Sequence, residues 1–366
     1  MNFINYHIPT RILLDKDVIN KNSMLFATYR GKALIVTGKT SSIVNGSLED
    51  VTNALKKEGI TYDVFNDVEE NPSLETVENI AKLGKAQNSN FLIGIGGGSP
   101  IDAAKAAGVL INNPNATRYN LFDSPHLISI PVIAIPTTAG TGTETTPYAI
   151  LTDKEIQTKR GICQKVFPEL ALLDVAYLMF IPEDITINTS VDALSHLIEG
   201  YLSSNANILS DALAEKGLKL FGECLNMLKE KDFTYQIREK LMVASTLAGM
   251  VIAQAGTSLP HGMGYPLTYF HNIPHGKANG VLLKSYLEFC ADENKVRKIL
   301  YLLTLENLDE LGVFLNSMLG HVNTVSYEDI CSYTDKMAIN NDKLKNHPAV
   351  VRREDILKIY NDSLKL

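Results

Sequence analysis

The sequence predicts an α/β domain built on a parallel sheet, followed by an all-helical domain. In the first half of the 366-residue chain, short runs of Val, Ile and Leu alternate with helical patterns, as in a parallel sheet that helices cover on both faces. From about Asn188 onward, nearly every segment has helical periodicity instead. The change falls near residues 180–184, so we expect domains over residues 1–183 and 184–366.

Four strands and three helices are expected in the first domain. Runs of Val, Ile, Leu and Ala dominate most of these strands, as in buried parallel strands. The helix over residues 73–88 has the clearest pattern, because Leu74, Val77, Ile80 and Leu83 recur at helical spacing. The expected strands cover residues 32–37, 61–65, 91–95 and 131–135, and the helices cover residues 46–58, 73–88 and 101–110.

Helical periodicity predicts eight helices in the second domain. One stretch, residues 256–280, interrupts them, because its glycines and prolines favour an irregular loop. The helices are expected over residues 191–203, 208–229, 235–254, 278–290, 294–303, 307–319, 327–339 and 353–364.

Composition and charge favour a globular protein that binds neither nucleic acid nor membrane. The hydrophobic content is 45%, the charged content is 20% and the net charge is −7, which suits neither of these anionic partners. No apolar run approaches the ~20 residues that span a bilayer, and the first residues lack the pattern of a signal peptide. The four cysteines contain no C-x-x-C pair, so we expect free thiols and a cytoplasmic location.

Four side chains predict a divalent-metal site in the second domain. Asp192 and His196 are four residues apart and share one helix face. His261 and His275 each lie between a proline and a glycine, where the backbone can direct a side chain. Carboxylate and imidazole ligands together suit a divalent metal. An acid near a helix start is also favoured without a metal, but the four residues together favour the metal interpretation.

Two loops that follow expected strands are candidates for binding a dinucleotide. Gly96, Gly97, Gly98 and Ser99 lie between a buried strand and a helix, so free N–H groups at the helix start can bind a pyrophosphate. Asp102 lies in the first turn of that helix, where an acid is also favoured as a cap. The second loop leaves the same edge of the sheet and is rich in threonine, including Thr137, Thr138 and Thr141.

The end of the first strand bears on the choice of cofactor. Sites that select NAD place an acid near a strand end, where it binds the ribose hydroxyl groups. Here Gly38 and Lys39 occupy that place, and a lysine among hydroxyl groups suits the 2′-phosphate of NADP. The same two residues also suit a plain turn with a solvated charge. We therefore expect NADP, with NAD as the alternative.

Four motifs together resemble those of the iron-containing (group III) alcohol dehydrogenases, relatives of glycerol dehydrogenase and dehydroquinate synthase. The resemblance covers essentially the whole chain, and the motifs are specific. It implies a dehydroquinate synthase-like fold, in which an N-terminal dinucleotide-binding domain precedes a helical domain. The motifs are GGGSPIDAAKA at residues 96–106, PTTAGTGTETT at 136–146, DALSHLIEGYLS at 192–203 and HGMGYPLTYFHNIPHGKANGVLL at 261–283.

The resemblance also assigns roles within the dinucleotide site. It implies that residues 96–99 hold the pyrophosphate, that Asp102 lies near the nicotinamide, and that Leu178 packs on the adenine. Thr137 and Thr138 are expected near the nucleotide. The position of Gly38 is often Asp in NAD-dependent members and Gly in NADP-dependent members, which again favours NADP.

For the second domain, the resemblance implies one divalent metal, usually Fe²⁺ and in some relatives Zn²⁺, bound by Asp192, His196, His261 and His275. One position departs from the family. Many members have a histidine four residues after His261, near the substrate, that is thought to help to move the proton. Tyr265 occupies that position here, and its ordinary pKa of about 10 is far from neutral. Tyr265 and His271 are therefore both candidates for the proton relay.

These residues predict a metal-dependent alcohol dehydrogenase or aldehyde reductase that transfers a hydride between NAD(P)(H) and a small alcohol or aldehyde. A Zn²⁺-dependent glycerol or polyol dehydrogenase and a non-catalytic dinucleotide-binding homologue are the alternatives. A lyase of the dehydroquinate synthase type is disfavoured, because the metal segments are poor in basic residues, with Lys277 alone. The family implies a homodimer.

Overall fold

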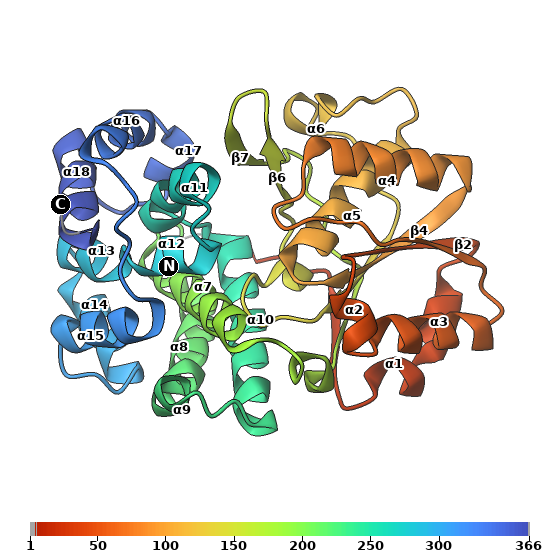
Figure 1. The fold of residues 1–366 in the computed structure, drawn as a ribbon, viewed down its shortest axis with the longest axis horizontal. Coiled ribbons are helices and arrows are strands. Elements are labelled where there is room, and N and C mark those ends of the chain that lie inside the picture. The colour runs from red at the N-terminus through yellow and green to blue at the C-terminus, as the bar shows by residue number, and fades with distance from the viewer. Residues whose placement is uncertain (1–3, 5, 365–366) are drawn as a thin grey trace. The chain divides into compact units, whose positions relative to one another are not determined.

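The structure is a computed structural model that describes residue 4 and residues 6–364 (Figure 1). The chain forms two compact units. The α/β unit contains Ile8–Thr138 and Gly142–Ile181. The helical unit contains the chain from Pro182 onward, together with Ala139–Thr141 and His7. Neither unit is therefore a single continuous segment.

A six-stranded parallel sheet forms the core of the α/β unit and confirms the predicted fold class. The four predicted strands are its β2 to β5, and two four-residue strands that the sequence did not predict complete it. An antiparallel hairpin of β6 (Ile150–Asp153) and β7 (Thr158–Gly161) forms a second sheet. The order of the large sheet is β1 (Arg11–Leu14), β8 (Leu170–Leu173), β5 (Val132–Pro136), β4 (Ser89–Gly96), β2 (Lys32–Thr37) and β3 (Tyr62–Phe65).

The pairing of β4 with β5 brings the two predicted dinucleotide loops to one edge of the sheet. The strands are parallel, with Gly96 opposite Pro136, so the following loops leave from adjacent positions. The Thr137 N–H donates to the Gly96 carbonyl at 2.8 Å. This is the carboxyl edge of the strands, where open α/β sheets bind ligands.

Helices cover both faces of the large sheet. α4 (Leu74–Ala86) and α5 (Gly98–Asn112) lie on one side, and α1 (Val18–Lys21) and α3 (Ser47–Lys57) lie on the other (Figure 1). α2 (Ser41–Val44) and α6 (Asn120–Asp123) are single short turns of helix. Buried residues from α4, α5, β2 and β4 pack into one apolar cluster that includes Val77, Val109, Leu34 and Leu92.

Two glycines permit the tight turn from β4 into α5. A Cβ atom at Gly94 would lie 2.9 Å from the Cα of Ile101, so the helix packs directly on the backbone of the strand. Gly96 has a φ of +148°, which residues with side chains rarely adopt. Together they let α5 begin at Gly98, immediately beyond the strand.

α7 is buried along its second half, where every residue from Ser190 to Leu202 is inaccessible to solvent or nearly so. α8, α10 and α12 pack against it. The helices of this unit are α7 (Glu183–Leu202), α8 (Ile208–Gly222), α9 (Leu225–Glu230), α10 (Tyr235–Ala255), α11 (Leu259–His271), α12 (His275–Gly280), α13 (Leu283–Phe289), α14 (Glu293–Leu302), α15 (Leu308–Leu319), α16 (Tyr327–Ala338), α17 (Asn341–Leu344) and α18 (Arg353–Leu364).

The prediction of an irregular loop over residues 256–280 is wrong, because α11 and α12 occupy most of it. Pro260 is the second residue of α11, where its missing N–H costs no helical hydrogen bond. Pro274 immediately precedes α12, which begins at His275. The Pro-His-Gly motifs therefore start helices rather than break them. Pro266 lies in the interior of α11, where it removes one backbone donor.

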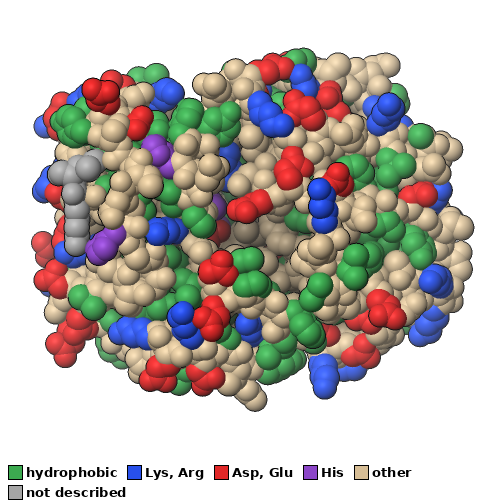
Figure 2. Space-filling model, viewed as in Figure 1, with side chains coloured by type: hydrophobic (Ala, Val, Ile, Leu, Met, Phe, Trp, Pro, Cys, Tyr) green, Lys and Arg blue, Asp and Glu red, His purple; other side chains and the backbone are tan. Residues whose placement is uncertain are grey.

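Two predicted helices are each divided in the structure. Residues 208–229 form α8 and α9, and residues 278–290 span the end of α12 and all of α13. Among the described residues, no single helix has the length and apolar character to cross a bilayer, and only α10 and α11 together, bent by 110°, meet that test. Basic and acidic side chains are interspersed over the face shown in Figure 2.

Candidate functional site

Three of the four predicted metal ligands converge in the helical unit. Potential ligand atoms of Asp192 on α7, His261 on α11 and His275 on α12 all lie within 4.8 Å of one another. The Asp192 Oδ1 atom is 3.4 Å from Nε2 of His261 and 3.7 Å from Nε2 of His275. Asp192 and His261 are each only 3% exposed. One carboxylate oxygen and two imidazole nitrogens therefore share a small, largely buried space.

The fourth predicted ligand, His196, lies one helical turn after Asp192 and stacks on His261. The two ring centroids are 4.4 Å apart, with 19° between the ring planes. Nδ1 of His196 lies 3.3 Å from the carbonyl oxygen of Gly140, an acceptor that fixes the proton on Nδ1 and leaves the lone pair on Nε2. Burial lowers the pKa of His196 to about 4, so the ring is neutral near pH 7, as a metal ligand requires.

The charges of the cluster are strongly coupled. Burial opposes ionisation of Asp192, but the imidazoles of His196, His275 and His261 hold its pKa well below the usual range. Burial also opposes protonation of His261, yet the carboxylates of Glu199 and Asp192 raise its pKa. The site is thus an ionised carboxylate facing imidazoles in a desolvated space, a donor set that fits a divalent cation.

The sequence analysis missed Glu199, which lies next to this cluster. Its carboxylate is fully buried and pairs with Nδ1 of His261. Its other oxygen accepts the N–H of Ser258 at 2.7 Å. The sequence contains a signal for it, because residues 192, 196 and 199 follow the i, i+4, i+7 spacing of one helix face.

Asn279 is a second residue that the sequence analysis missed. It lies one turn after His275 on α12 and is fully buried. Its amide nitrogen donates to Asp192 Oδ1 at 3.1 Å and lies 3.2 Å from Nε2 of His275. A Cβ atom at Gly264 would approach the Asn279 amide oxygen to 2.2 Å, so the glycine of α11 makes room for this side chain. The i, i+4 spacing from His275 was its signal in the sequence.

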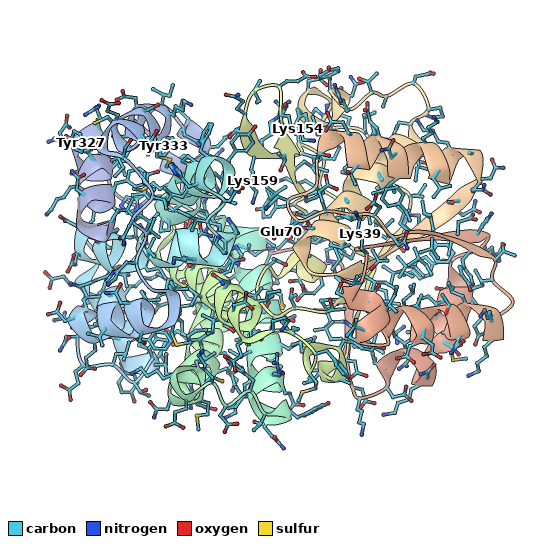
Figure 3. The ribbon with its side chains drawn as sticks, in the orientation of Figure 1. Lys39, Glu70, Lys154, Lys159, Tyr327 and Tyr333 are labelled. Atoms are coloured by element: carbon cyan, nitrogen blue, oxygen red, sulfur yellow. The ribbon has the colours of Figure 1, made fainter. Side chains whose placement is uncertain are left out.

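The two candidates for the proton relay occupy different surroundings. The Tyr265 ring stacks on His275, with centroids 5.9 Å apart, and the Lys343 ammonium lies 5.5 Å from the same tyrosine ring. Nε2 of His271 is 2.9 Å from the hydroxyl oxygen of Tyr333 on α16, a residue labelled in Figure 3. Of the two candidates, only Tyr265 is therefore in contact with a member of the candidate metal cluster among the contacts described.

The glycine loop of the α/β unit lies against the second predicted loop. A Cβ atom at Gly97 would lie 3.0 Å from the Thr138 hydroxyl oxygen. The backbone of Gly98 and Ser99 opens α5, a 15-residue helix whose first N–H groups have no intrahelical acceptor. The Ser99 hydroxyl accepts the Asn71 N–H at 3.1 Å. Lys159 of β7, which Figure 3 labels, donates to the Asn71 side-chain oxygen at 2.8 Å.

Asp102 and Lys105 hold the threonine-rich loop in place from within α5. The buried Asp102 carboxylate accepts from the Thr143 hydroxyl and from the Ile150 N–H at 2.8 Å. Burial raises its pKa. The Lys105 ammonium, 0% exposed, donates to the carbonyls of Thr143, Thr146 and Tyr148 at 2.7–2.9 Å. The sequence analysis gave no role to Lys105, which also donates to the Thr143 hydroxyl at 2.7 Å and whose acceptors all lie some forty residues further along the chain.

The other residues predicted to bind the cofactor lie outside the glycine loop and have varied surroundings. Lys39 forms an exposed ion pair with Asp67, with 2.9 Å between Nζ and Oδ1. A Cβ atom at Gly38 would have no neighbour nearer than the Val68 carbonyl oxygen at 3.5 Å, so the structure does not require glycine there. Leu178 is 1% exposed. Thr141 belongs to the three-residue segment that clusters with the helical unit.

Comparison with known proteins gives consistent matches. Residues 9–175 match the family described as iron-containing alcohol dehydrogenase, and residues 186–364 match the C-terminal domain of the Fe-containing alcohol dehydrogenase family. The chain is 37% identical to lactaldehyde reductase of Escherichia coli K12 over 270 residues, which cover 71% of this chain and 69% of that protein. It is 32% identical to an NADPH-dependent butanol dehydrogenase of Clostridium saccharobutylicum over 263 residues, or 70% and 67% of the two chains.

Solved structures share the whole fold. An iron-containing alcohol dehydrogenase from Thermotoga maritima superposes with a TM-score of 0.93 and 38% identity, over 99% of both chains. A 1,3-propanediol oxidoreductase superposes with a TM-score of 0.89 and 26% identity, over 99% of this chain and 100% of the other.

Proposed function

The chain belongs to the iron-containing alcohol dehydrogenase family, and we propose on that basis which of its residues carry the reaction. The protein is an oxidoreductase that transfers a hydride between a nicotinamide dinucleotide and a small alcohol or aldehyde. The observation that best supports the residue assignments is the convergence of Asp192, His261 and His275. The two alternatives, a polyol dehydrogenase and a non-catalytic homologue, have no comparable support.

Asp192, His196, His261 and His275 would hold one divalent metal, Fe²⁺ in this proposal and Zn²⁺ as the alternative. The fit is chemical: three imidazoles and one carboxylate suit either ion, and the neutral state of His196 suits a ligand. When bound, such a metal acts as a Lewis acid on the oxygen of the alcohol or aldehyde. The protein's own part is to hold these donors in a desolvated space, where electrostatic interactions are stronger.

The dinucleotide would bind along the carboxyl edge of the large sheet. Free N–H groups of Gly97, Gly98 and Ser99 at the start of α5 suit the pyrophosphate. We propose NADP because Gly38 leaves space and Lys39 supplies a cation for the 2′-phosphate, which would compete with Asp67 for the ammonium. The similarity to an NADPH-dependent butanol dehydrogenase also supports NADP.

The proton exchanged with the substrate oxygen would pass through the hydroxyl of Tyr265. Its ring lies against His275, whereas His271 is hydrogen-bonded to Tyr333. We therefore rank Tyr265 before His271. The four free cysteines are consistent with a cytoplasmic location, and family membership suggests a homodimer, which a measurement of the mass in solution tests.

The decisive experiment loads the metal-free protein with Fe²⁺ under anaerobic conditions and follows NADPH oxidation with a panel of short aldehydes, with NADH in parallel. Faster turnover with NADPH than with NADH is expected. Turnover with NADH alone would overturn the cofactor assignment and leave the activity in place. His261→Ala and His275→Ala variants should lose both metal and turnover, and metal retained at the wild-type level in either variant would exclude that residue as a ligand.

A further inference from the structure

Glu199 lies on the same face of α7 as Asp192 and His196 but belongs to no predicted ligand set. Its side chain is 0% exposed. A carboxylate is costly to bury unless its oxygens accept hydrogen bonds. The partners of Glu199 therefore indicate why the chain keeps a carboxylate at this place.

All the described hydrogen-bond donors to Glu199 belong to two residues at the start of α11, Ser258 just before the helix and His261 in its first turn. One carboxylate oxygen accepts from Nδ1 of His261. The other accepts the backbone N–H of Ser258 at 2.7 Å and that of His261 at 3.4 Å. Ser258 precedes the first residue of α11, and its own side chain makes no capping hydrogen bond. Glu199 thus caps α11 from a neighbouring helix.

The capping contact and the imidazole contact act on the same residue. The hydrogen bonds to the backbone fix the position of His261 in the first turn of α11. The contact at Nδ1 places the ring proton on that atom, so the lone pair is on Nε2. Nε2 is the atom that faces Asp192 Oδ1 at 3.4 Å. A carboxylate that accepts from a ligating imidazole also makes the imidazole a stronger donor.

Charge balance supports the same role. Asp192 and Glu199 are two buried carboxylates about two turns apart on one face of α7, and a divalent cation bound by the imidazoles and Asp192 would offset part of their charge. Lys343, whose ammonium contacts the Thr257 hydroxyl, is a basic residue whose charge also stabilises the Glu199 carboxylate. Its ammonium lies 5.5 Å from the centre of the Tyr265 ring.

We propose that Glu199 is a positioning residue of the metal centre, which fixes the backbone, ring orientation and tautomer of His261 and thereby sets the affinity for divalent metal. This inference rests on the metal assignment of the proposed function. It names a residue that acts through His261 and touches neither the substrate nor the cofactor.

Glu199→Gln is the sharpest variant because it changes the hydrogen bonding with little change of shape. Glutamine has one acceptor oxygen, so its amide group must face an N–H donor either at Ser258 or at His261. The Co²⁺ affinity of the metal-free protein should fall about 10- to 100-fold, the effect usual for such outer partners, and the visible absorption of bound Co²⁺ should shift. Glu199→Asp, which keeps the carboxylate, should recover part of the loss.

The matched control is Glu215→Gln on α8, where the carboxylate accepts from the Tyr201 hydroxyl at 2.9 Å in the same unit. It should bind Co²⁺ as the wild type does. Urea unfolding of the metal-free variants separates folding from metal binding: if Glu199→Gln unfolds, Glu199→Asp provides the comparison.

The outcomes separate this inference from the proposed function. Failure of the wild-type protein to bind Co²⁺ or Fe²⁺ overturns the metal assignment itself. Tight binding by the wild type, with an unchanged affinity and an unchanged spectrum in Glu199→Gln, overturns the positioning role alone. A weaker affinity with equal loss in Glu215→Gln would also overturn it, because the effect would then be a general response of the helical unit.

Discussion

At the scale of single residues, the histidines of the helical unit differ in what their ring nitrogens contact. His196 faces a backbone carbonyl and His261 faces a carboxylate, so each has a fixed tautomer. His271, at the end of the helix that carries His261, contacts the hydroxyl of Tyr333 on α16. His347 is 5% exposed, and neither ring nitrogen has a hydrogen-bond partner among the described residues.

The choice between Tyr265 and His271 can be made with one pair of variants. Tyr265→Phe keeps the ring against His275 and removes only the hydroxyl, so metal content should be unchanged. If the hydroxyl moves the proton, kcat should fall by about 10²-fold or more, and its pH profile should change. His271→Ala should retain kcat within a factor of a few. The reverse pattern would assign the relay to His271.

His347 should make the stability of the helical unit depend on pH. Burial lowers its pKa to about 4 from an ordinary value near 6.5, so the unfolded chain binds the additional proton between these values. The stabilisation is fully present above pH 6.5 and is lost as the pH falls toward 4, by on the order of 2 kcal/mol.

His347→Leu should therefore flatten the fall of the unfolding free energy between pH 6.5 and 4.5, as measured by urea titration at each pH. His321→Leu, at an exposed position of the same unit, is the control and should leave that slope unchanged. Parallel curves for the wild type and His347→Leu would contradict the prediction.

The site residues that could be predicted from the sequence differ in their hydrogen-bond partners from those that could not. Asp192 and His196, and equally Glu199, share a helix face that their spacing displays. Their convergence with His261, more than sixty residues later, needed either the resemblance or the structure. Lys105 was not predicted, because three of its four acceptors are carbonyl oxygens, which no residue type at those positions reveals; the fourth is the Thr143 hydroxyl.

At the scale of helices and strands, four strands of the large sheet were predicted and two were not. β2, β4 and β5 contain clear apolar runs, and β3 was also expected although it has only four residues. β1 and β8, which also have four residues each, were not expected. The loop expected over residues 256–280 failed for a different reason. Proline is compatible with the first turn of a helix, so a Pro-His-Gly motif can either interrupt a helix or begin one. In the structure both motifs begin helices, and these helices pack against α7.

We expect Lys105 on α5 to stabilise the conformation of the threonine-rich loop. Lys105→Met would leave three buried carbonyls without their shared donor and Asp102 without its cationic neighbour. The free energy of unfolding should fall by about 3–5 kcal/mol, and dinucleotide affinity should fall as well. Urea unfolding and fluorescence titration with NADPH measure the two effects.

The control for that variant is Lys82→Met on the exposed face of α4, which should change stability by no more than about 0.5 kcal/mol. If Lys105→Met matches this control in stability, the buried ammonium is not what holds the loop.

At the scale of the whole molecule, each ligand should stabilise its own unit. Metal at a hundred times its dissociation constant should add about 2.7 kcal/mol to the stability of the form that binds it. Because the candidate ligands come from α7, α11 and α12, the metal should slow hydrogen exchange there and leave the large sheet unchanged. NADPH should do the opposite. Equal protection of both units by the metal alone would contradict this division.

Because each unit contains segments that are not contiguous in sequence, the two units cannot be separated by dividing the chain at a single position. Ala139–Thr141 clusters with the helical unit although α/β segments flank it on both sides in the chain, and His7 clusters with the same unit although the α/β unit begins at Ile8. A truncated gene that encodes only residues 182–366 would lack the Gly140 carbonyl that faces His196. A chimaera that joins the first half of a relative to the second half of this chain would likewise place the relative's residues against α7 where Ala139–Thr141 lies here. During synthesis, that segment leaves the ribosome before its partner helix exists, so its contact with α7 can form only after the helical unit has been made.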